Sequence, residues 1–484
     1  MLLNTYYKIV SGVLTARLKP ALDYLIHADQ KAYLQNRYVG EITRSTYDIL
    51  DHAKHNNLPG LILLLDFAKA FDSIEHKFIF KVLDFFNFGP SIKKWINILI
   101  SNFYCSINHC GNLSERFKLS RGVKQGDPIS GYLFILCSEI LSERLRQNPM
   151  IEGLQIGNTT KNLDSYADDT TVYLKVYPDD MTMTENNLRH TLKDIDDFYN
   201  ISGLKTNWDK TLAIRIGTMC ESETQLCQDR NLRWDKDFTL LGITYDNKLS
   251  KTDDFVNSKV EEIRKVLNLW RYRTLTPFGK ITVIKTLALP KITHIALILP
   301  ELNEHLAKKI EKIFINFLWN GKNSKVAKNI IIMPEDRGGL NMINLPNFWK
   351  ALKITWLRRL LATKSTWADI LDLELGKLGY SREDLYSCGN SHLRKISTQL
   401  RNPFWKDVLN NSAEMLDNIP FSHPKSLTLL PVCGSTIFKI ANSAIKYNFI
   451  GGRRDILVTD LIHDDKRFLN LAEFNKKITQ LSTS

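Results

Sequence analysis

Three aspartates stand where short apolar runs end, and side chains of this kind can hold divalent metal ions. Asp66 directly follows the run Leu61–Leu65, which is too short for a buried helix and has the length of a buried strand. The pair Asp168-Asp169 lies between the strand-like runs Leu163–Ala167 and Thr170–Val176, so we predict a hairpin with both aspartates at its tip. A carboxylate held at the end of a rigid strand is well suited to a metal.

An Asp-Asp pair is informative only in its context. The same dipeptide recurs in polar or helical stretches, where we expect solvated charges, at Asp179-Asp180, Asp196-Asp197, Asp253-Asp254 and Asp464-Asp465. Only Asp168-Asp169 lies between two strand-like runs. Two adjacent like charges in a partly buried turn repel each other, and a cation is the natural compensation.

Asp66, Asp168 and Asp169 on two sheet elements could form a cage for two Mg²⁺ ions about 3.5–4 Å apart, and Mn²⁺ could substitute. Mg²⁺ prefers a few carboxylates together with substrate phosphates, which fits nucleotidyl transfer. One ion would lower the pKa of a primer 3′-hydroxyl. The other would neutralise charge on the triphosphate and on the leaving pyrophosphate.

A further segment, Arg121–Pro128, combines two glycines with a proline. Glycine permits a close approach of the backbone, and Pro128 can open the helix predicted over residues 129–147. Taken alone, this pattern fits any turn that leads into a helix, and it also fits a functional loop.

The elements expected around these segments mix helices with short strands as far as residue 245, which is an α+β pattern. Helices are predicted over most of 1–60, over 76–103 with a break at Gly89-Pro90, and over 185–201; further strands are predicted at Leu212–Ile216 and Thr239–Tyr245. From residue 250 we expect helices, with a domain boundary near 248. One apolar helical stripe is formed by Leu306, Ile310, Ile313, Phe314 and Phe317.

The chain is basic, and its charge is unevenly placed. The net charge is +13, and residues 251–360 hold 20 Lys and Arg against 9 Asp and Glu. A basic face of this kind favours a polyanionic partner, most readily a nucleic acid. The alternatives are a solvated helical surface and an anionic membrane surface, but no long basic amphipathic helix with a broad apolar face supports the latter.

The cysteines point to a reduced compartment. They are seven in number, irregularly spaced and without a C-x-x-C motif, so neither a disulfide framework nor a zinc site is expected, even at Cys388 and His392. The sequence contains no apolar run of 18 or more residues, so no transmembrane helix is predicted. The first 22 residues lack acidic side chains, like a transit peptide, but a chain that simply begins inside a domain explains this better.

Five segments together carry a family resemblance. In chain order they are Leu65–Ile74, Gln125–Pro128, Tyr166–Asp169, Gly203–Asn207 with Lys210-Thr211, and Leu240–Ile243. They resemble the five palm motifs of reverse transcriptases, in the version typical of LINE-type non-LTR retrotransposons, with the fifth being the primer grip. Residues 2–9 and 30–40 are similar to the fingers of this family, and the resemblance extends weakly beyond residue 360.

The resemblance implies a right-hand polymerase fold. Residues 1–247 would form a partial fingers region and the palm with a small antiparallel sheet, residues 248–345 a basic helical thumb, and residues 346–484 a helical region of unknown role. Asp66 and Asp168 would ligate both metal ions, and Asp169 would complete the carboxylate set.

Other roles follow from the same resemblance. Phe71 would be a steric gate against a ribose 2′-hydroxyl, the alternative being an ordinary core aromatic. Lys210 could protonate pyrophosphate as a general acid, or be an exposed structural lysine. Asp72 is better explained as a helix-start carboxylate than as a ligand. The triphosphate would lie on the backbone of Phe67, Ala68, Lys69 and Ala70, and the incoming nucleotide or template on Gln125 and Gly126.

The implied function is RNA-directed DNA polymerisation, with an RNA template, a DNA primer and deoxynucleoside triphosphates. An element-encoded ribonucleoprotein could be a further partner; no membrane is involved, and the nucleus and cytoplasm are the expected locations. A full-length element of this type would carry an endonuclease domain and a further fingers segment before Met1. We therefore expect a truncated copy, and the alternative function is a catalytically dead, nucleic-acid-binding remnant.

Overall fold

A computed structural model describes residues 3–101, 104–222, 224, 226–230, 232–300, 304–324, 326–360, 365–387, 390–417, 439–440 and 443–444. Predictions for the rest of 418–484, Asp464-Asp465 among them, and for Cys388 lie outside these residues. The chain divides into two compact units, Met1–Thr252 and Asp253–Ser484, and each is described by itself.

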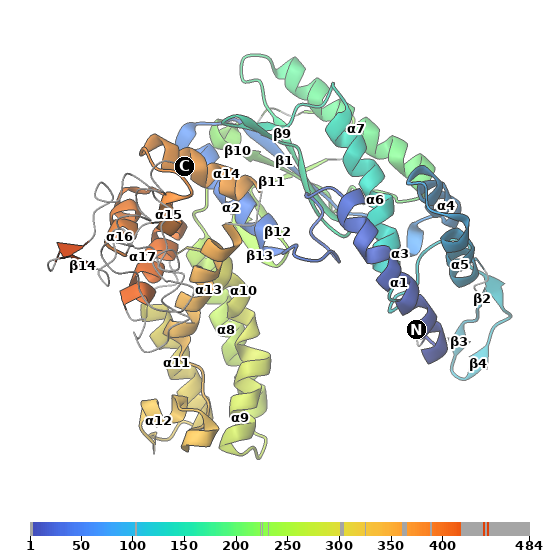
Figure 1. The fold of residues 1–484 in the computed structure, drawn as a ribbon. Coiled ribbons are helices and arrows are strands. Elements are labelled where there is room, and N and C mark those ends of the chain that lie inside the picture. Colours follow the sequence, from blue (N-terminus) through green and yellow to red (C-terminus); the bar gives the residue numbers. More distant parts are fainter. Residues whose placement is uncertain are drawn as a thin grey trace, which may run out of the picture. The chain divides into compact units, whose positions relative to one another are not determined.

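The first unit is built on a five-stranded sheet (Figure 1). Its strands are β1 (Gly60–Leu65), β8 (Leu163–Tyr166), β9 (Asp169–Lys175), β10 (Leu212–Ile216) and β11 (Arg233–Asp235). The strand order is β11-β10-β1-β9-β8, and all neighbours are antiparallel except β10 and β11. The predicted strand at Leu61–Leu65 is therefore the centre of the sheet.

Helices surround this sheet. They are α1 (Thr5–Leu25), α2 (Gly40–Asn56), α3 (Ala70–Ser73), α4 (His76–Phe85), α5 (Pro90–Ile100), α6 (Ser130–Gln147), α7 (Met181–Ser202) and the short η1 (Gly217–Glu221). Helices α6 and α7 contact each other, and α7 contacts β9 (Figure 1). Strand β1 reads as a continuous apolar run because both of its faces are covered: Ile62 and Leu63 point to opposite sides and are both buried.

Small hairpins complete the first unit. They pair β2 (Tyr104–Cys105) with β5 (Phe117–Lys118), β3 (Asn108–His109) with β4 (Asn112–Leu113), β6 (Leu154–Ile156) with β7 (Thr159–Lys161), and β12 (Asp237–Leu240) with β13 (Ile243–Asp246). The prediction of one strand over Thr239–Tyr245 is wrong. Leu241 and Gly242 have φ values of 48° and 82°, so they form a tight turn that folds the segment back on itself.

The second unit is helical in its described part. It contains α8 (Thr252–Arg271), α9 (Pro277–Val283), η2 (Ile284–Ala288), α10 (Pro290–Ile298), α11 (Glu304–Leu318), α12 (Lys328–Ile332), η3 (Glu335–Arg337), α13 (Leu345–Leu360), α14 (Thr366–Lys377), α15 (Asp384–Ser387), α16 (Asn390–Gln399) and α17 (Pro403–Asp417), with the short strands β14 (Lys439–Ile440) and β15 (Ser443–Ala444). In α11 the predicted stripe is buried at Ile310, Phe314 and Phe317. The predicted α+β class, with a small antiparallel sheet followed by helices, is confirmed.

Two compositional features can be followed into the structure. Among the described residues, no single helix is both long enough and apolar enough to cross a membrane; one pair bent by 48°, Pro277–Ala288 with Pro290–Ile298, reaches that length and composition jointly. The cysteines of the described part, from Cys105 to Cys227, are free thiols.

Candidate metal and nucleotide site

The sheet register brings the three predicted carboxylates to one end of neighbouring strands. The last pair of the β1–β9 ladder is Leu65 with Thr170, so Asp66 leaves β1 beside Asp169, the first residue of β9. The β8–β9 ladder ends at the pair Tyr166 with Asp169, which leaves Asp168 in the connecting turn. Residues directly opposite each other on antiparallel strands have Cα atoms about 4.5–5.5 Å apart.

The turn itself differs by one residue from the prediction. The tip is Ala167-Asp168 rather than Asp168-Asp169, and Asp169 belongs to β9. The reason is the backbone of Ala167, whose φ of 57° is left-handed and reverses the chain one residue earlier. Such a conformation is unfavourable for alanine and needs support from outside the hairpin.

The electrostatics agree with three neighbouring negative charges. Burial is the largest cause that raises the pKa of Asp168; a backbone hydrogen bond opposes it, and the charge of Asp66 adds to it. Burial, followed by the charges of Asp168 and Asp66, raises the pKa of Asp169 to about 6. Asp169 is nevertheless open to solvent, so a dissolved ion could reach it. Carboxylates that oppose one another in this way are a donor set suited to a hard divalent cation.

The carboxylates share a sheet end without forming a closed cage. Within the described residues, no three His, Cys, Asp or Glu side chains are arranged closely enough to hold a metal ion. The three carboxylates fit Mg²⁺ in their chemistry, and the register places their backbone at one end of the sheet.

A segment of the fourth motif fixes the chain on both sides of Asp66. The Asp66 carbonyl accepts a hydrogen bond from the Asn207 N–H at 2.7 Å, and the Ala68 N–H donates to the Lys205 carbonyl at 2.8 Å. The Asp66 N–H donates to Thr211 Oγ1 at 3.3 Å. Sequence reasoning missed this clamp because backbone groups make most of it.

Residues 67–70, which are predicted to bind the triphosphate, form a turn that is held by hydrogen bonds from Ser73. Lys69 is exposed and has a left-handed φ of 51°. The Ser73 hydroxyl contacts the carbonyls of both Ala68 and Lys69, at 2.8 and 2.9 Å. Phe67 and Ala70 are buried, so the backbone between them is held from the core side.

Phe71, the predicted gate, is only partly buried and stacks on the buried ring of Phe134, with 4.5 Å between ring centroids. Its carbonyl accepts a hydrogen bond from the Val123 N–H at 2.7 Å, which ties it to the Arg121–Pro128 segment. Phe134 lies in α6 and was not singled out in the sequence, where it reads as one more core aromatic. One face of the Phe71 ring is thus covered by Phe134.

The Arg121–Pro128 segment is anchored at both ends. At Gly122, φ is 81° and a Cβ would lie 2.8 Å from the Asp72 carbonyl oxygen, so glycine is required. Asp127 is buried and accepts hydrogen bonds from Tyr7, at 2.7 Å, and from Ser11. Gln125 lines a cavity of about 400 Å³ together with Asp72, His76, Arg121 and others.

The remaining predicted residues, Asp72, Gly126 and Lys210, are all exposed. The Lys210 N–H donates to the Asn207 carbonyl at 3.1 Å. Gly126, with a φ of 86°, forms part of the turn before α6. The structure leaves both explanations of Lys210 open, and no contact of a described residue assigns Asp72 a ligand role.

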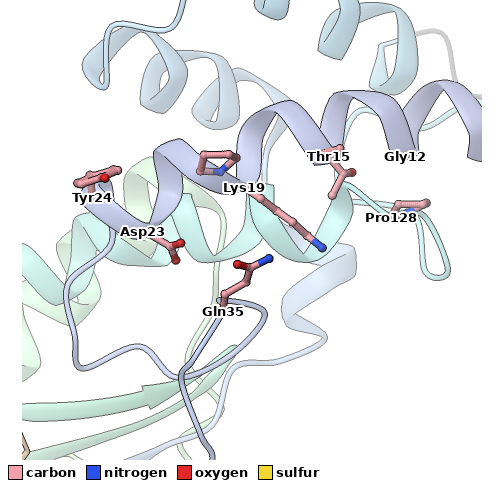
Figure 2. A pocket seen from close by; sticks show the side chains of 9 residues that line it. Gly12, Thr15, Lys19, Asp23, Tyr24, Gln35 and Pro128 are labelled. Atoms are coloured by element: carbon pink, nitrogen blue, oxygen red, sulfur yellow. The ribbon is translucent and has the colours of Figure 1, made fainter. Parts of the chain in front are cut away.

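A larger cleft of about 600 Å³ lies beside α1 (Figure 2). Lys19 and Gln35 extend into it, and Pro128 closes one side. The Lys19 ammonium is 5.4 Å from the ring centroid of Tyr132. None of the three carboxylates lines this cleft, so it is separate from the predicted metal site.

Comparisons with known proteins give a consistent result. Residues 1–245 match the family model described as "Reverse transcriptase (RNA-dependent DNA polymerase)". The chain is 25% identical over 412 residues, 82% of its length, to the transposon TX1 uncharacterized 149 kDa protein of Xenopus laevis, and covers 30% of that protein. It is 24% identical over 348 residues, 69% of its length, to the Pol polyprotein of the type-2 retrotransposable element R2DM of Drosophila melanogaster, and covers 31% of it.

The chain thus spans about a third of the length of these relatives. Among solved structures, telomerase from Candida tropicalis in complex with a fragment of telomeric RNA is similar with a TM-score of 0.37 and 16% identity, over 75% of this chain and 56% of that one.

Proposed function

Because the chain belongs to the reverse transcriptase family, and to its non-LTR kind, we propose that it extends a DNA primer on an RNA template at Asp66, Asp168 and Asp169. The observation that carries this proposal is the register of β1, β9 and β8, with Leu65 opposite Thr170 and Tyr166 opposite Asp169. Three carboxylates at one sheet end, with raised pKa values at two of them, have a ready explanation in cation binding.

In the proposed reaction, the primer 3′-oxygen attacks the α-phosphorus of a deoxynucleoside triphosphate. A new P–O bond forms, the bond to the β-phosphate oxygen breaks, and pyrophosphate leaves. The 3′-hydroxyl proton passes to solvent, and a proton for pyrophosphate could come from Lys210. Two Mg²⁺ ions, when bound, would lower the pKa of the hydroxyl and neutralise charge on the phosphates.

The chain's own residues would mainly position the reactants, which is the larger part of catalysis in phosphoryl transfer. Asp66, Asp168 and Asp169 would hold the metal ions. The turn from Phe67 to Ala70, in which Lys69 is exposed, would hold the triphosphate, and Phe71 would exclude a ribose 2′-hydroxyl. Gln125 and Gly126 would contact the incoming nucleotide or the template.

Purified full-length chain should extend a labelled DNA primer on an RNA template with Mg²⁺ and all four deoxynucleoside triphosphates. Excess EDTA should stop extension, and added Mg²⁺ or Mn²⁺ should restore it, because the carboxylates cannot replace the cations. Gel resolution of the primer measures both. Absence of extension under every divalent ion tested would refute catalysis by this chain and leave its family membership intact.

A second candidate function, nucleic-acid binding without catalysis, is favoured by the basic stretch 251–360. Arg264, Lys265 and Arg273 are exposed on or just after α8, and Tyr272, which precedes Arg273 in the chain, is exposed as well. If six to ten phosphates are contacted, the affinity for a primer–template duplex should fall about 10³- to 10⁵-fold between about 50 and 200 mM salt. Fluorescence anisotropy of a labelled duplex measures this dependence.

The double variant Arg264→Gln, Lys265→Gln should reduce the salt slope, by about 0.9 for each phosphate contact that it removes. Lys77→Gln with Lys81→Gln, two exposed lysines of α4, removes the same charge from outside the basic stretch and serves as the matched control. Equal slopes for the two double variants would contradict a specific role for the basic stretch.

A further inference from the structure

We propose that Gln30 is a positioning residue for the Asp168 and Asp169 carboxylates. It acts by hydrogen bonding to the main-chain N–H and carbonyl of Ala167. This inference rests on the proposed function for the role of those carboxylates in binding metal. Gln30 lies in the segment before α2, 137 residues away from Ala167 in sequence, and is 2% exposed. A glutamine side chain so deeply buried needs partners for its whole amide.

The Gln30 amide finds those partners on the turn. Its Oε1 accepts a hydrogen bond from the Ala167 N–H at 2.9 Å, and its Nε2 donates to the Ala167 carbonyl at 3.4 Å. The same Oε1 also accepts from the Ala32 N–H at 3.0 Å. One side chain therefore engages both polar groups of the residue that holds the left-handed conformation, and supplies the outside support that this turn needs.

The backbone around Gln30 is itself fixed to the hairpin. The Lys31 N–H donates to the Ser165 carbonyl at 2.9 Å, and the Ser165 N–H donates to the Asp29 carbonyl at 3.1 Å. Gln30 and Ser165 form a parallel β-bridge, so the segment around Gln30 pairs with β8 at the edge of the sheet. The position of the amide relative to Ala167 is thus set by main-chain bonds.

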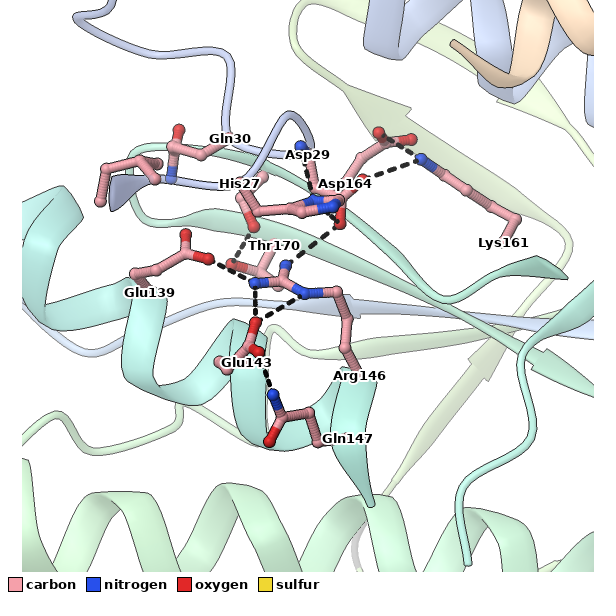
Figure 3. Close-up of polar contacts among 12 residues, drawn as sticks. His27, Asp29, Gln30, Glu139, Glu143, Arg146, Gln147, Lys161, Asp164 and Thr170 are labelled. Atoms are coloured by element: carbon pink, nitrogen blue, oxygen red, sulfur yellow. Dashed lines mark hydrogen bonds and ion pairs between the residues drawn. The ribbon is translucent and has the colours of Figure 1, made fainter. Parts of the chain in front are cut away.

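A network of charged side chains connects the segment around Gln30, through Asp29, to Arg146 of α6 and Lys161 of β7 (Figure 3). Asp29 pairs with Arg146 at 3.1 Å and lies 3.8 Å from Lys161. Lys161 pairs with Asp164 of β8 at 2.6 Å. Arg146 also bonds Glu139 and Glu143 of its own helix, α6. Half-buried to buried ion pairs of this kind specify one arrangement, because breaking either partner leaves an uncompensated charge.

Only an amide of this length fits the contacts described. A methionine has nearly the same shape but neither donates nor accepts strongly, and an asparagine keeps the amide but is shorter by one methylene. We expect Gln30→Met to release the Ala167 turn, and Gln30→Asn to weaken its support. Removing a group that orients metal ligands usually lowers metal affinity or activity about 10- to 100-fold.

The first test measures binding of Mn²⁺ alone to the full chain by isothermal titration calorimetry, in the wild type, Gln30→Met, Gln30→Asn and Asp168→Asn. The dissociation constant should rise about 10- to 100-fold in Gln30→Met and less in Gln30→Asn. Asp168→Asn should lose the site. In primer extension, Gln30→Met should lower kcat while leaving KM for the primer–template unchanged.

Asn187 provides a matched control. It is a second buried amide that clamps backbone, bonding the N–H and carbonyl of Glu152 and the carbonyl of Lys175, at the other end of β9. Asn187→Leu should lower the melting temperature about as much as Gln30→Met does, and leave Mn²⁺ affinity at the wild-type value.

Three outcomes decide the matter. Wild-type Mn²⁺ affinity in both folded Gln30 variants, with a lowered melting temperature, would mean that Gln30 only stabilises the fold, and would overturn the proposal. If Gln30→Met does not fold, wild-type affinity in Gln30→Asn overturns it equally. Mn²⁺ binding that survives Asp168→Asn would instead refute the metal site of the proposed function, and the role of Gln30 with it.

Discussion

Replacing Asp168 by Asn should lower the rate of primer extension by at least about 10³-fold, because a metal ligand supplies several kcal/mol of charge stabilisation and each 1.4 kcal/mol is a factor of ten. Asn is close in size to Asp but brings no charge. Since Asp66 and Asp168 oppose each other as like charges, the variant should melt at the same temperature as the wild type or higher. Single-nucleotide incorporation and differential scanning calorimetry measure the two quantities.

The chain offers a matched control for this prediction. Asp179 is an exposed aspartate in another Asp-Asp pair, at the loop before α7. Asp179→Asn removes the same charge and should leave extension unchanged. An Asp168→Asn variant that extends primers at the wild-type rate would contradict the assignment of the site, whatever its stability.

Replacing Phe71 by Val should relax the choice between deoxyribonucleotides and ribonucleotides. The ring stacks on Phe134 and is only partly buried, and we expect its exposed part to meet a ribose 2′-hydroxyl. Removing a steric contact of this size should raise the relative efficiency for the ribonucleotide about 10- to 200-fold. The ratio of kcat/KM for CTP and dCTP, measured by single-nucleotide incorporation, tests this.

Phe78 supplies the comparison, since it is a buried aromatic that packs against Phe198 at 5.6 Å and belongs to α4. Phe78→Val should destabilise the fold and leave the nucleotide ratio unchanged. If Phe71→Val behaves in the same way, Phe71 is an ordinary core aromatic, as the alternative explanation holds.

The strands that carry the candidate site were predictable because their signals are local. Strand β1 reads as a continuous apolar run since both faces are covered, and Asp66 directly follows it. The break between α4 and α5 was predicted at Gly89-Pro90, and Pro90 opens α5. In both cases neighbouring residues in the sequence determine the outcome.

The turn at Ala167-Asp168 could not be placed correctly because Gln30, far away in sequence, stabilises its conformation. The hydrogen bonds that hold the chain around Asp66 were not predicted. Most of them join main-chain groups, which nearly every residue type provides. At the hairpin turn Leu241-Gly242 the sequence does contain a turn signal, Gly242. The apolar residues around it instead favoured the prediction of one continuous strand.

The hydrogen bonds around Asp66 also determine which changes the chain can accommodate. Asn207 and Lys205 contribute main-chain atoms, so many side chains at these two positions are compatible with the same bonds. Adding or removing one residue between 203 and 211 would instead shift every partner and draw Asp66 out of line with Asp169. The segment is therefore constrained in its number of residues far more than in its composition, and acts as a spacer of fixed length for the carboxylate beside it.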